Sequence, residues 1–169
     1  MKIFLVGMMG SGKTYWSKVI SKKLKIPFYD LDSLIEILEE QTINEIFENS
    51  GEEYFRKIET KILKWFVQKK TFVLATGGGT PCFNNNISWM NKTGLTVWLN
   101  DSVENIFERL KSEKENRPAI KNLSDIEIEK FIYQKLVERN EYYSQSKIQL
   151  EENGINEKNM LLQIKKNKV

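Results

Sequence analysis

A glycine-rich run near the start of the chain carries the strongest chemical signal. Residues 7–14 read GMMGSGKT, a complete G-x-x-x-x-G-K-[ST] pattern. Where this pattern follows a strand and opens a helix, successive backbone N–H groups converge on phosphate oxygens and the helix adds its positive end. Lys13 is then expected to reach the β- and γ-phosphates, and the Thr14 hydroxyl to hold Mg²⁺. A glycine-rich turn that only redirects the chain is the alternative, but the predicted strand and helix favour nucleoside triphosphate binding.

Two carboxylates, Asp30 and Asp32, close the next predicted strand. Strand residues two apart project to the same side, and ligands of open parallel sheets bind beyond the carboxyl ends of the strands. One carboxylate could hold the Mg²⁺ shell while the other accepts a hydrogen bond from an acceptor hydroxyl. Alternatively, Asp32 caps a helix beginning at Ser33. The two interpretations of Asp32 are equally supported by the sequence.

Two arginines accompany apolar stripes of predicted helices. Arg139 is in phase with four apolar residues, Ile128, Ile132, Leu136 and Tyr143. An unpaired buried charge costs roughly 3–5 kcal/mol, so Arg139 needs an anion. Arg56 follows Phe55, and the two arginines could form a bidentate receptor for a substrate carboxylate. Pairing of Arg56 with Glu52 or Glu59, and extension of Arg139 to solvent, are the alternatives, and for each arginine alone they are favoured.

A second glycine run, Gly77-Gly78-Gly79, follows Thr76 at the end of a predicted strand. Without side chains, the backbone lets a small ligand approach closely. Alone, such a run indicates a tight turn. Its place at a strand end, in the same layer as the phosphate loop and Asp32, favours a ligand-binding role.

Composition excludes several kinds of chemistry. The chain has no histidine, which excludes Ser-His-Asp and Cys-His nucleophiles and every His-based metal site. Its one cysteine, Cys82, allows no internal disulfide and indicates a reducing, cytoplasmic location. The net charge of +3, from 26 basic and 23 acidic residues, predicts no nucleic-acid partner. No apolar run is long enough to span a bilayer, so no membrane partner is expected.

Strand-like and helix-like segments alternate along the chain. The predicted strands are 2–6, 27–30, 72–76, 96–99 and 147–150, and the predicted helices are 14–24, 33–40, 43–49, 52–68, 103–114, 126–143 and 157–165. Such alternation predicts an α/β fold with a parallel sheet covered on both faces. The length predicts one domain over residues 1–169. The polar stretch 112–125, which contains Arg117 and Pro118, predicts a mobile surface loop.

Together these elements resemble the shikimate kinase family from about residue 2 to residue 143. The resemblance is carried by the motifs in order: the loop at 7–14, Asp-x-Asp at 30–32, Phe55-Arg56-x-x-Glu59, Gly77-Gly78-Gly79, Arg117-Pro118, and Arg139 followed by Tyr142. It implies a P-loop NTPase fold in three α/β/α layers, with a five-stranded parallel sheet and a mobile lid at about 112–125. It also implies transfer of the ATP γ-phosphoryl group to shikimate with Mg²⁺, in a monomer.

The resemblance also implies roles for individual residues. The catalytic set is Lys13, Asp32 as the base, and Arg117 as a lid residue that neutralises the transferring phosphoryl group. The implied ATP-binding residues are Gly10, Ser11, Gly12, Lys13, Thr14, Tyr15, Arg109 and Arg117. The implied shikimate-binding residues are Asp32, Arg56, Gly78, Gly79 and Arg139, and the implied metal-binding residues are Thr14 and Asp30.

Two other functions remain open. One is a related small-molecule kinase acting on gluconate or a nucleoside monophosphate; the paired arginines and the glycine run favour a compact anionic polyol instead. The other is a nucleotide-binding regulatory module without catalysis. Lys13, Asp32 and Arg117 together favour a catalyst, because a module that only binds nucleotide has little need of Asp32.

Overall fold

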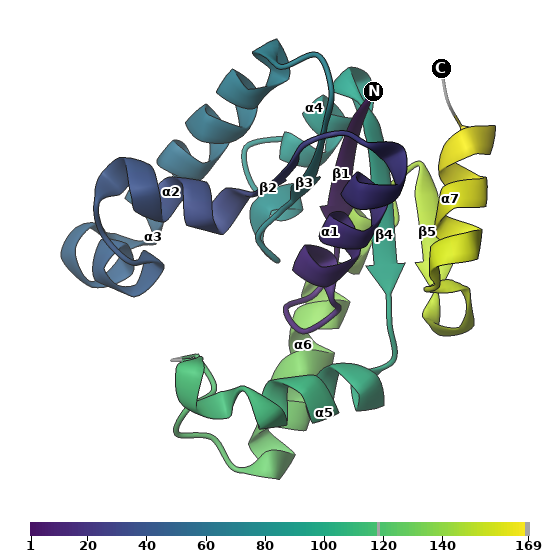
Figure 1. Ribbon diagram of the computed structural model, residues 1–169. Helices are drawn as coiled ribbons and strands as arrows, with labels where there is room; N and C mark the ends of the chain where they lie inside the picture. Colours follow the sequence, from purple (N-terminus) through teal and green to yellow (C-terminus); the bar gives the residue numbers. More distant parts are fainter. Residues whose placement is uncertain (118, 168–169) are drawn as a thin grey trace.

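Five parallel strands form the centre of the molecule. The computed structural model describes residues 1–117 and 119–167. The strands are β1 (Lys2–Val6), β2 (Phe28–Asp30), β3 (Phe72–Ala75), β4 (Leu95–Asn100) and β5 (Ile148–Glu151), in the order β2-β3-β1-β4-β5 (Figure 1). All five strands predicted from the sequence are confirmed, with ends that match or differ by one residue.

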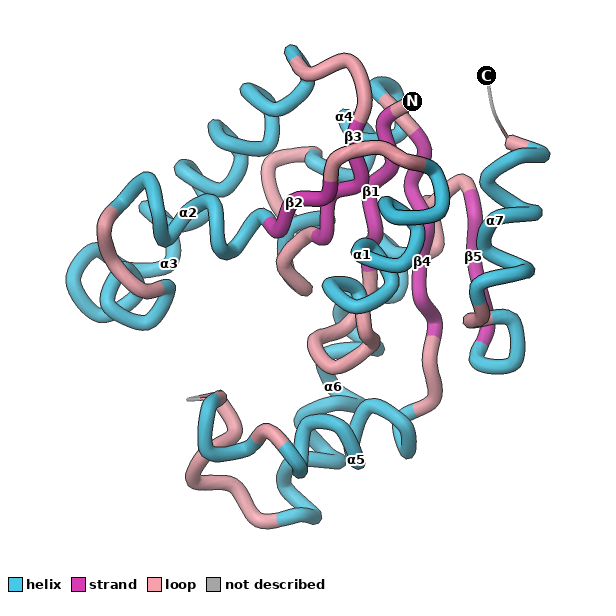
Figure 2. Tube along the Cα trace, viewed as in Figure 1, coloured by secondary structure: helices cyan, strands magenta, loops and turns pink. Residues whose placement is uncertain are grey.

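Helices cover both faces of this sheet (Figure 2). They are α1 (Lys13–Leu24), α2 (Leu31–Glu39), α3 (Ile43–Trp65), α4 (Asn86–Thr93), α5 (Val103–Ser112), α6 (Asp125–Tyr143) and α7 (Glu157–Lys166). Alternation along β1 sends Ile3 and Leu5 to the core beneath α1 and α7. Phe4 and Val6 enter the opposite core with α2, α3 and α4. The predicted three-layer α/β/α arrangement is therefore confirmed.

A third apolar cluster lies beyond the carboxyl ends of the strands, where α5 and α6 pack together (Figure 1). Ile120, from the predicted lid, is fully buried in it beside Leu110 and Ile128. The stretch 112–125 is thus anchored at Ile120, although the sequence predicted a surface loop throughout. Pro118 lies outside the described residues.

Two helices differ from the prediction for local reasons. The predicted helices 43–49 and 52–68 are one run, α3, with a kink at Gly51, whose φ of 79° glycine adopts without strain. The sequence did not predict α4. Asn84 and Asn85 both adopt left-handed backbone conformations, with φ of 50° and 58°, immediately before α4 begins. Within the described residues, no helix is both long enough and apolar enough to cross a membrane.

Candidate active site

The phosphate loop has the strand–loop–helix context that its sequence predicts. It leaves β1 at Val6 and enters α1 at Lys13, and Gly10 and Gly12 take φ of 79° and 82°. The Lys13 ammonium donates to the carbonyls of Gly7 at 2.9 Å and Met8 at 2.8 Å, which holds it beneath the loop. Burial lowers the Lys13 pKa to about 8, although Asp32 and Asp30 oppose this shift.

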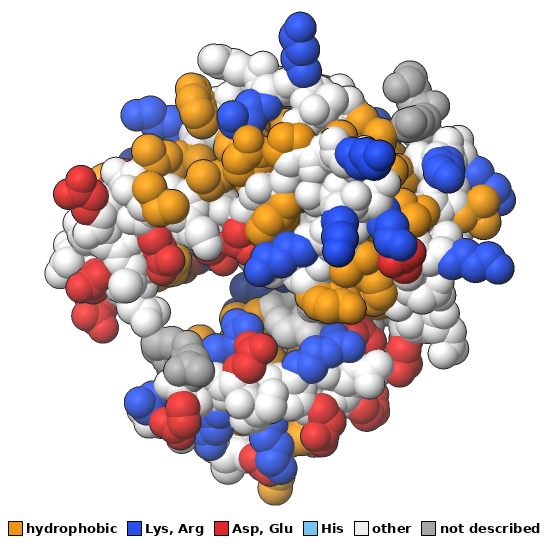
Figure 3. Space-filling view, in the orientation of Figure 1, with side chains coloured by type: hydrophobic (Ala, Val, Ile, Leu, Met, Phe, Trp, Pro, Cys, Tyr) orange, Lys and Arg blue, Asp and Glu red, His pale blue; other side chains and the backbone are white. Residues whose placement is uncertain are grey.

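A cleft of about 610 Å³ opens beside this loop, at the carboxyl ends of the strands. The space-filling view shows the molecule hollowed here, with Lys and Arg side chains around the hollow (Figure 3). Besides loop residues, its lining contains Tyr15, Asp30, Asp32, Thr76, Gly78, Arg109, Glu113 and Arg117. Residues predicted to bind the nucleotide, such as Arg117, and residues predicted to bind the acceptor, such as Asp32, therefore line one cleft.

Asp30, not Asp32, caps the helix that follows β2. Helix α2 begins at Leu31, and Asp30 Oδ1 accepts from the backbone N–H groups of Asp32 at 3.2 Å and Ser33 at 3.5 Å. The proposed capping role of Asp32 is therefore wrong. The strand-alternation argument for the pair is also wrong, because Asp32 lies in the first turn of α2. Both carboxylates nevertheless line the cleft.

The second oxygen of Asp30 faces the phosphate loop. Thr14 Oγ1 donates to Asp30 Oδ2 at 2.7 Å. A hydroxyl and a carboxylate oxygen at one edge of a phosphate-binding cleft match the hard oxygen ligands that Mg²⁺ prefers. Within the described chain, no group of three or more Cys, Asp or Glu residues could enclose a metal. A magnesium ion here would therefore need phosphate oxygens and water to complete its coordination.

Asp32 is a strongly perturbed carboxyl group. Burial, followed by the charges of Asp30 and Glu59, raises its pKa to about 6, and Lys13 opposes this shift. A Cβ atom at Gly77 would lie 2.9 Å from Asp32 Oδ1, so the second glycine run passes directly against this carboxylate. A carboxylate with a pKa of about 6 is well suited to accept a proton near neutral pH.

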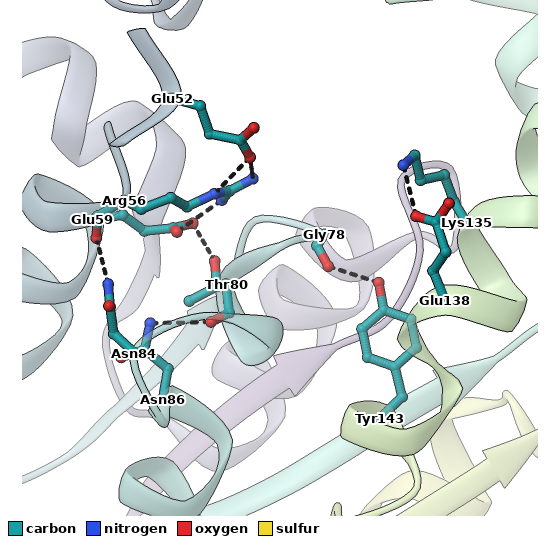
Figure 4. A network of polar contacts seen from close by, with 10 residues as sticks. All are labelled: Glu52, Arg56, Glu59, Gly78, Thr80, Asn84, Asn86, Lys135, Glu138 and Tyr143. Carbon is teal, nitrogen blue, oxygen red and sulfur yellow. Dashed lines mark hydrogen bonds and ion pairs between the residues drawn. The ribbon is translucent and has the colours of Figure 1, made fainter. Parts of the chain in front are cut away.

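Arg56 is held by the internal ion pairs that the sequence offered as an alternative. Its Nη1 lies 2.8 Å from Glu59 Oε2, and its Nη2 lies 3.2 Å from Glu52 Oε1 (Figure 4). Glu59 is fully buried and accepts from Thr80 Oγ1 at 2.5 Å. The guanidinium still reaches the glycine run, because a Cβ atom at Gly79 would lie only 2.6 Å from Arg56 Nη2. The pairs therefore orient Arg56 against this loop.

Arg139, from α6, lies against the same glycine run and has no carboxylate partner among the described residues. A Cβ atom at Gly78 would be 3.1 Å from Arg139 Nη1, which also contacts Met8 Sδ at 3.8 Å. Across the part of the chain that the structure describes, no acidic side chain forms an ion pair with Arg139. The structure therefore brings both arginines to the glycine run and leaves one guanidinium charge available.

The residue that anchors this glycine run was missed. Tyr143 is fully buried, and its hydroxyl donates to the Gly78 carbonyl at 2.6 Å (Figure 4). Burial raises the Tyr143 pKa above its ordinary value, so the hydroxyl stays protonated and remains a donor. The motif comparison had singled out Tyr142, which is only partly buried. The helical phase that places Tyr143 with Ile132 could have identified it.

Two further arginines line the nucleotide end of the cleft, each paired with a carboxylate. Arg109 Nη1 lies 2.5 Å from Asp101 Oδ2 and donates to the Gly10 carbonyl at 2.9 Å. Arg117 Nε donates to Glu113 Oε2 at 2.8 Å, and its Nη2 contacts the same oxygen. The sequence did not indicate Glu113, which also lines the cleft.

Two predicted ATP-binding residues occupy contrasting positions. Tyr15 is 63% exposed at the cleft and packs edge-on against Trp16. Ser11 is fully buried, and its hydroxyl has no hydrogen-bond partner among the described residues. Ser11 is therefore buried within the loop, and its backbone N–H donates to Met8 O at 3.1 Å.

Comparison with known proteins gives one consistent result. A family model described as shikimate kinase matches residues 9–167. A shikimate kinase of Flavobacterium psychrophilum is 45% identical over 148 residues, covering 86% of each chain. The crystal structure of a Bacteroides thetaiotaomicron shikimate kinase aligns with a TM-score of 0.90 at 36% identity, over 98% of this chain and 95% of that one. A shikimate kinase of Acinetobacter baumannii, in complex with shikimate, aligns with a TM-score of 0.87 at 32% identity, over 99% and 94% of the two chains.

Proposed function

Because the chain belongs to the shikimate kinase family, we propose that its cleft transfers the ATP γ-phosphoryl group to the 3-hydroxyl of shikimate, with the roles below. Enzymes of this kind are ATP-dependent phosphotransferases, so the open questions concern which side chains hold each substrate. The observation that supports the proposal best is the unpaired Arg139 guanidinium beside Gly78.

The acceptor carboxylate would bind to the two arginines of the glycine run. Arg139 supplies a charge that the described protein leaves unneutralised, and a bound carboxylate would remove the penalty of that unpaired charge. Arg56, fixed by Glu59, would offer its remaining N–H groups. The backbone of Gly78 and Gly79 has no side chain to exclude a compact ring from this corner.

Asp32 would orient the attacking hydroxyl and accept its proton. It lies against Gly77, next to the glycine that Arg139 approaches, and it lines the cleft with Lys13. Its pKa of about 6 leaves it ionised at neutral pH while keeping it basic enough to act. A ring held by its carboxylate at Arg139 could thus present a hydroxyl to Asp32.

The phosphate side needs positive charge more than covalent chemistry. Lys13 and the loop N–H groups would hold the β- and γ-phosphates, and Arg117 would leave Glu113 to meet the charge of the transferring group. Tyr15 and Arg109 would contact the nucleotide, and Thr14 and Asp30 would hold Mg²⁺. When bound, the ion neutralises charge on the phosphate oxygens.

An acceptor panel tests this proposal directly. ADP release would be measured by a coupled assay with shikimate, gluconate and AMP as acceptors. We expect turnover with shikimate and, in Arg139→Ala, a selective loss of shikimate use. Turnover with gluconate or AMP only would refute the proposed acceptor, and nucleotide binding without any turnover would favour a regulatory module.

Three properties of the whole protein complete the proposal. We expect residues 1–169 to act as one kinase domain, as a monomer, in the cytoplasm. The alignment over 98% of the chain with a single kinase supports the first of these. Analytical ultracentrifugation at catalytic concentrations would test the second.

A further inference from the structure

A carboxylate to which the proposed function assigns no role lies where β4 gives way to α5. Asp101 directly follows β4 and precedes Ser102, the N-terminal cap of α5. Figure 1 shows this connection running beyond the carboxyl ends of the strands. The Asp101 side chain is only 3% exposed. A buried carboxylate costs free energy unless hydrogen bonds and a cation compensate its charge, so the partners of Asp101 decide whether its burial is favourable.

Both carboxylate oxygens of Asp101 have partners from α5 or its cap. Oδ1 accepts from the Ser102 backbone N–H at 3.0 Å and from Asn105 Nδ2 at 2.9 Å. Oδ2 accepts from Arg109 Nη1 at 2.5 Å. The start of α5 therefore holds Asp101 in place, and Asp101 in turn holds the Arg109 guanidinium.

Arg109 is a long side chain that is fixed at the edge of the active site. It lies in the last turn of α5, and its Nη1 also donates to the Gly10 carbonyl of the phosphate loop at 2.9 Å. Asp101 and Gly10 accept the two N–H groups of Nη1, so Nε and Nη2 still have three to offer a ligand. The side chain lines the cleft and is 45% exposed. Arg109 is thus presented to the cleft from a defined position.

A second segment of the chain supports Asp101 through Asn105. Nδ2 of Asn105 donates to Asp101 Oδ1 and also to Glu152 Oε1, the latter at 2.8 Å. Because both partners are carboxylates, only the NH₂ group of the amide can face them. Glu152 begins the short 3-10 turn after β5, so side-chain hydrogen bonds connect this turn to Arg109.

Two opposite effects of Asp101 on a bound nucleotide follow from this geometry. An arginine that is free before binding loses rotamer freedom when it contacts a ligand, whereas an arginine already held in place loses much less. Asp101 therefore favours binding by fixing Arg109. Its negative charge, close to the phosphate loop, would instead repel phosphates. Removing that charge should weaken nucleotide binding if the first effect is larger, and strengthen it if the second is.

We propose that Asp101 is a positioning residue for the nucleotide, which holds Arg109 against the phosphate loop in the orientation that contacts ATP. Asp101 acts through Arg109, and Asn105 supports Asp101 from the other side. This inference rests on the proposed function, in which Arg109 contacts the nucleotide, and it does not depend on the acceptor.

Titration calorimetry with ADP and Mg²⁺ tests the proposal without any acceptor. Asp101→Asn removes the ion pair with Arg109 and should raise the ADP Kd about three- to tenfold. Glu108→Gln removes the same charge from an exposed position on α5 and should leave the Kd unchanged. An unchanged or lower Kd in Asp101→Asn would overturn the proposal. Failure of the wild type to phosphorylate shikimate would refute the proposed acceptor and leave this comparison intact.

A double-mutant cycle separates positioning from a general structural role. Asp101→Asn should change the ADP Kd by less than about twofold when it is introduced into Arg109→Ala, because the guanidinium that it positions is already gone. A loss of the same size in both backgrounds would show that Asp101 only stabilises the connection between β4 and α5, and would overturn the proposal.

Two asparagine variants provide the same test if Asp101→Asn does not fold. Asn105→Ala leaves the Asp101 carboxylate in place but removes one of its supports, so it should raise the ADP Kd. Asn100 Nδ2 donates to Glu151 Oε2 at 2.8 Å, a contact of the same kind that does not involve Asp101. Asn100→Ala should therefore leave the Kd unchanged. Equal Kd values for the two variants would overturn the proposal.

Discussion

Replacing Asp32 with asparagine should make the protein more stable while it abolishes turnover. The Asp32 pKa is raised from 3.8 to about 6, chiefly by burial, so the folded protein holds the Asp32 proton more tightly than the unfolded chain does. Stability must then fall as pH rises through the interval from about 4 to about 6. Above about pH 6, the ionised Asp32 carboxylate lowers the free energy of unfolding.

The size of the effect follows from the two pKa values. A difference of about two pH units corresponds to about 3 kcal/mol, which is an upper value because the side chain reaches the open cleft. Asp32→Asn keeps the shape and removes the charge. We therefore expect its free energy of unfolding at pH 8 to exceed that of the wild type by about 1–3 kcal/mol. At pH 3.5 the difference should vanish.

Urea denaturation followed by circular dichroism at pH 3.5, 5, 6 and 8 would measure this difference. Glu129→Gln, an exposed change of the same charge on α6, serves as the control and should show no comparable gain. A variant less stable than the wild type at pH 8, or a gain that is the same at every pH, would refute the argument that burial raises the Asp32 pKa.

Three other predictions follow from the same cleft. Arg139→Ala should raise the shikimate KM about tenfold or more while changing the ATP KM little, because Arg139 lacks a carboxylate partner in the described protein. Equal changes in both KM values would contradict the proposal that Arg139 binds the shikimate carboxylate. The kcat/KM for shikimate should rise about tenfold per pH unit below about 6, as Asp32 ionises, and decline above about 8, as Lys13 loses its proton; a profile flat from pH 5 to 9 would exclude both assignments. Tyr143→Phe should leave the Gly78 carbonyl without its donor, lower the free energy of unfolding by about 1–3 kcal/mol and raise the shikimate KM; urea denaturation and initial rates would measure the two effects, and a change in neither would show that this hydrogen bond is dispensable.

Much of the framework could be predicted because its signals are local. The five strands are apolar runs bounded by polar turns, and the phosphate loop is a contiguous motif whose flanking strand and helix could both be recognised. The helical phase of Arg139 with Ile128 and Ile132 correctly indicated a guanidinium beside an apolar stripe. These inferences needed no knowledge of long-range contacts.

The remainder depended on contacts between distant segments. Helix α2 begins at Leu31, and Asp30 is therefore its N-terminal cap. No local feature of the sequence distinguishes a helix that begins at Leu31 from one that begins at Ser33. The paired roles of Glu59, with Arg56 on one side and Thr80 on the other, need the fold to bring residues 59 and 80 together. The helix α4 follows two asparagines in left-handed conformations, and the short polar segment that contains them did not predict a helix.

The divided carboxylate of Asp30 has a practical consequence for redesign. One oxygen fixes the start of α2, which carries Asp32, and the other holds Thr14 at the start of α1. The first turns of these two helices are thus joined through a single side chain. Anyone who alters position 30 to change nucleotide or metal preference will also shift the helix that presents the acceptor's base, so libraries aimed at one substrate should be screened for both.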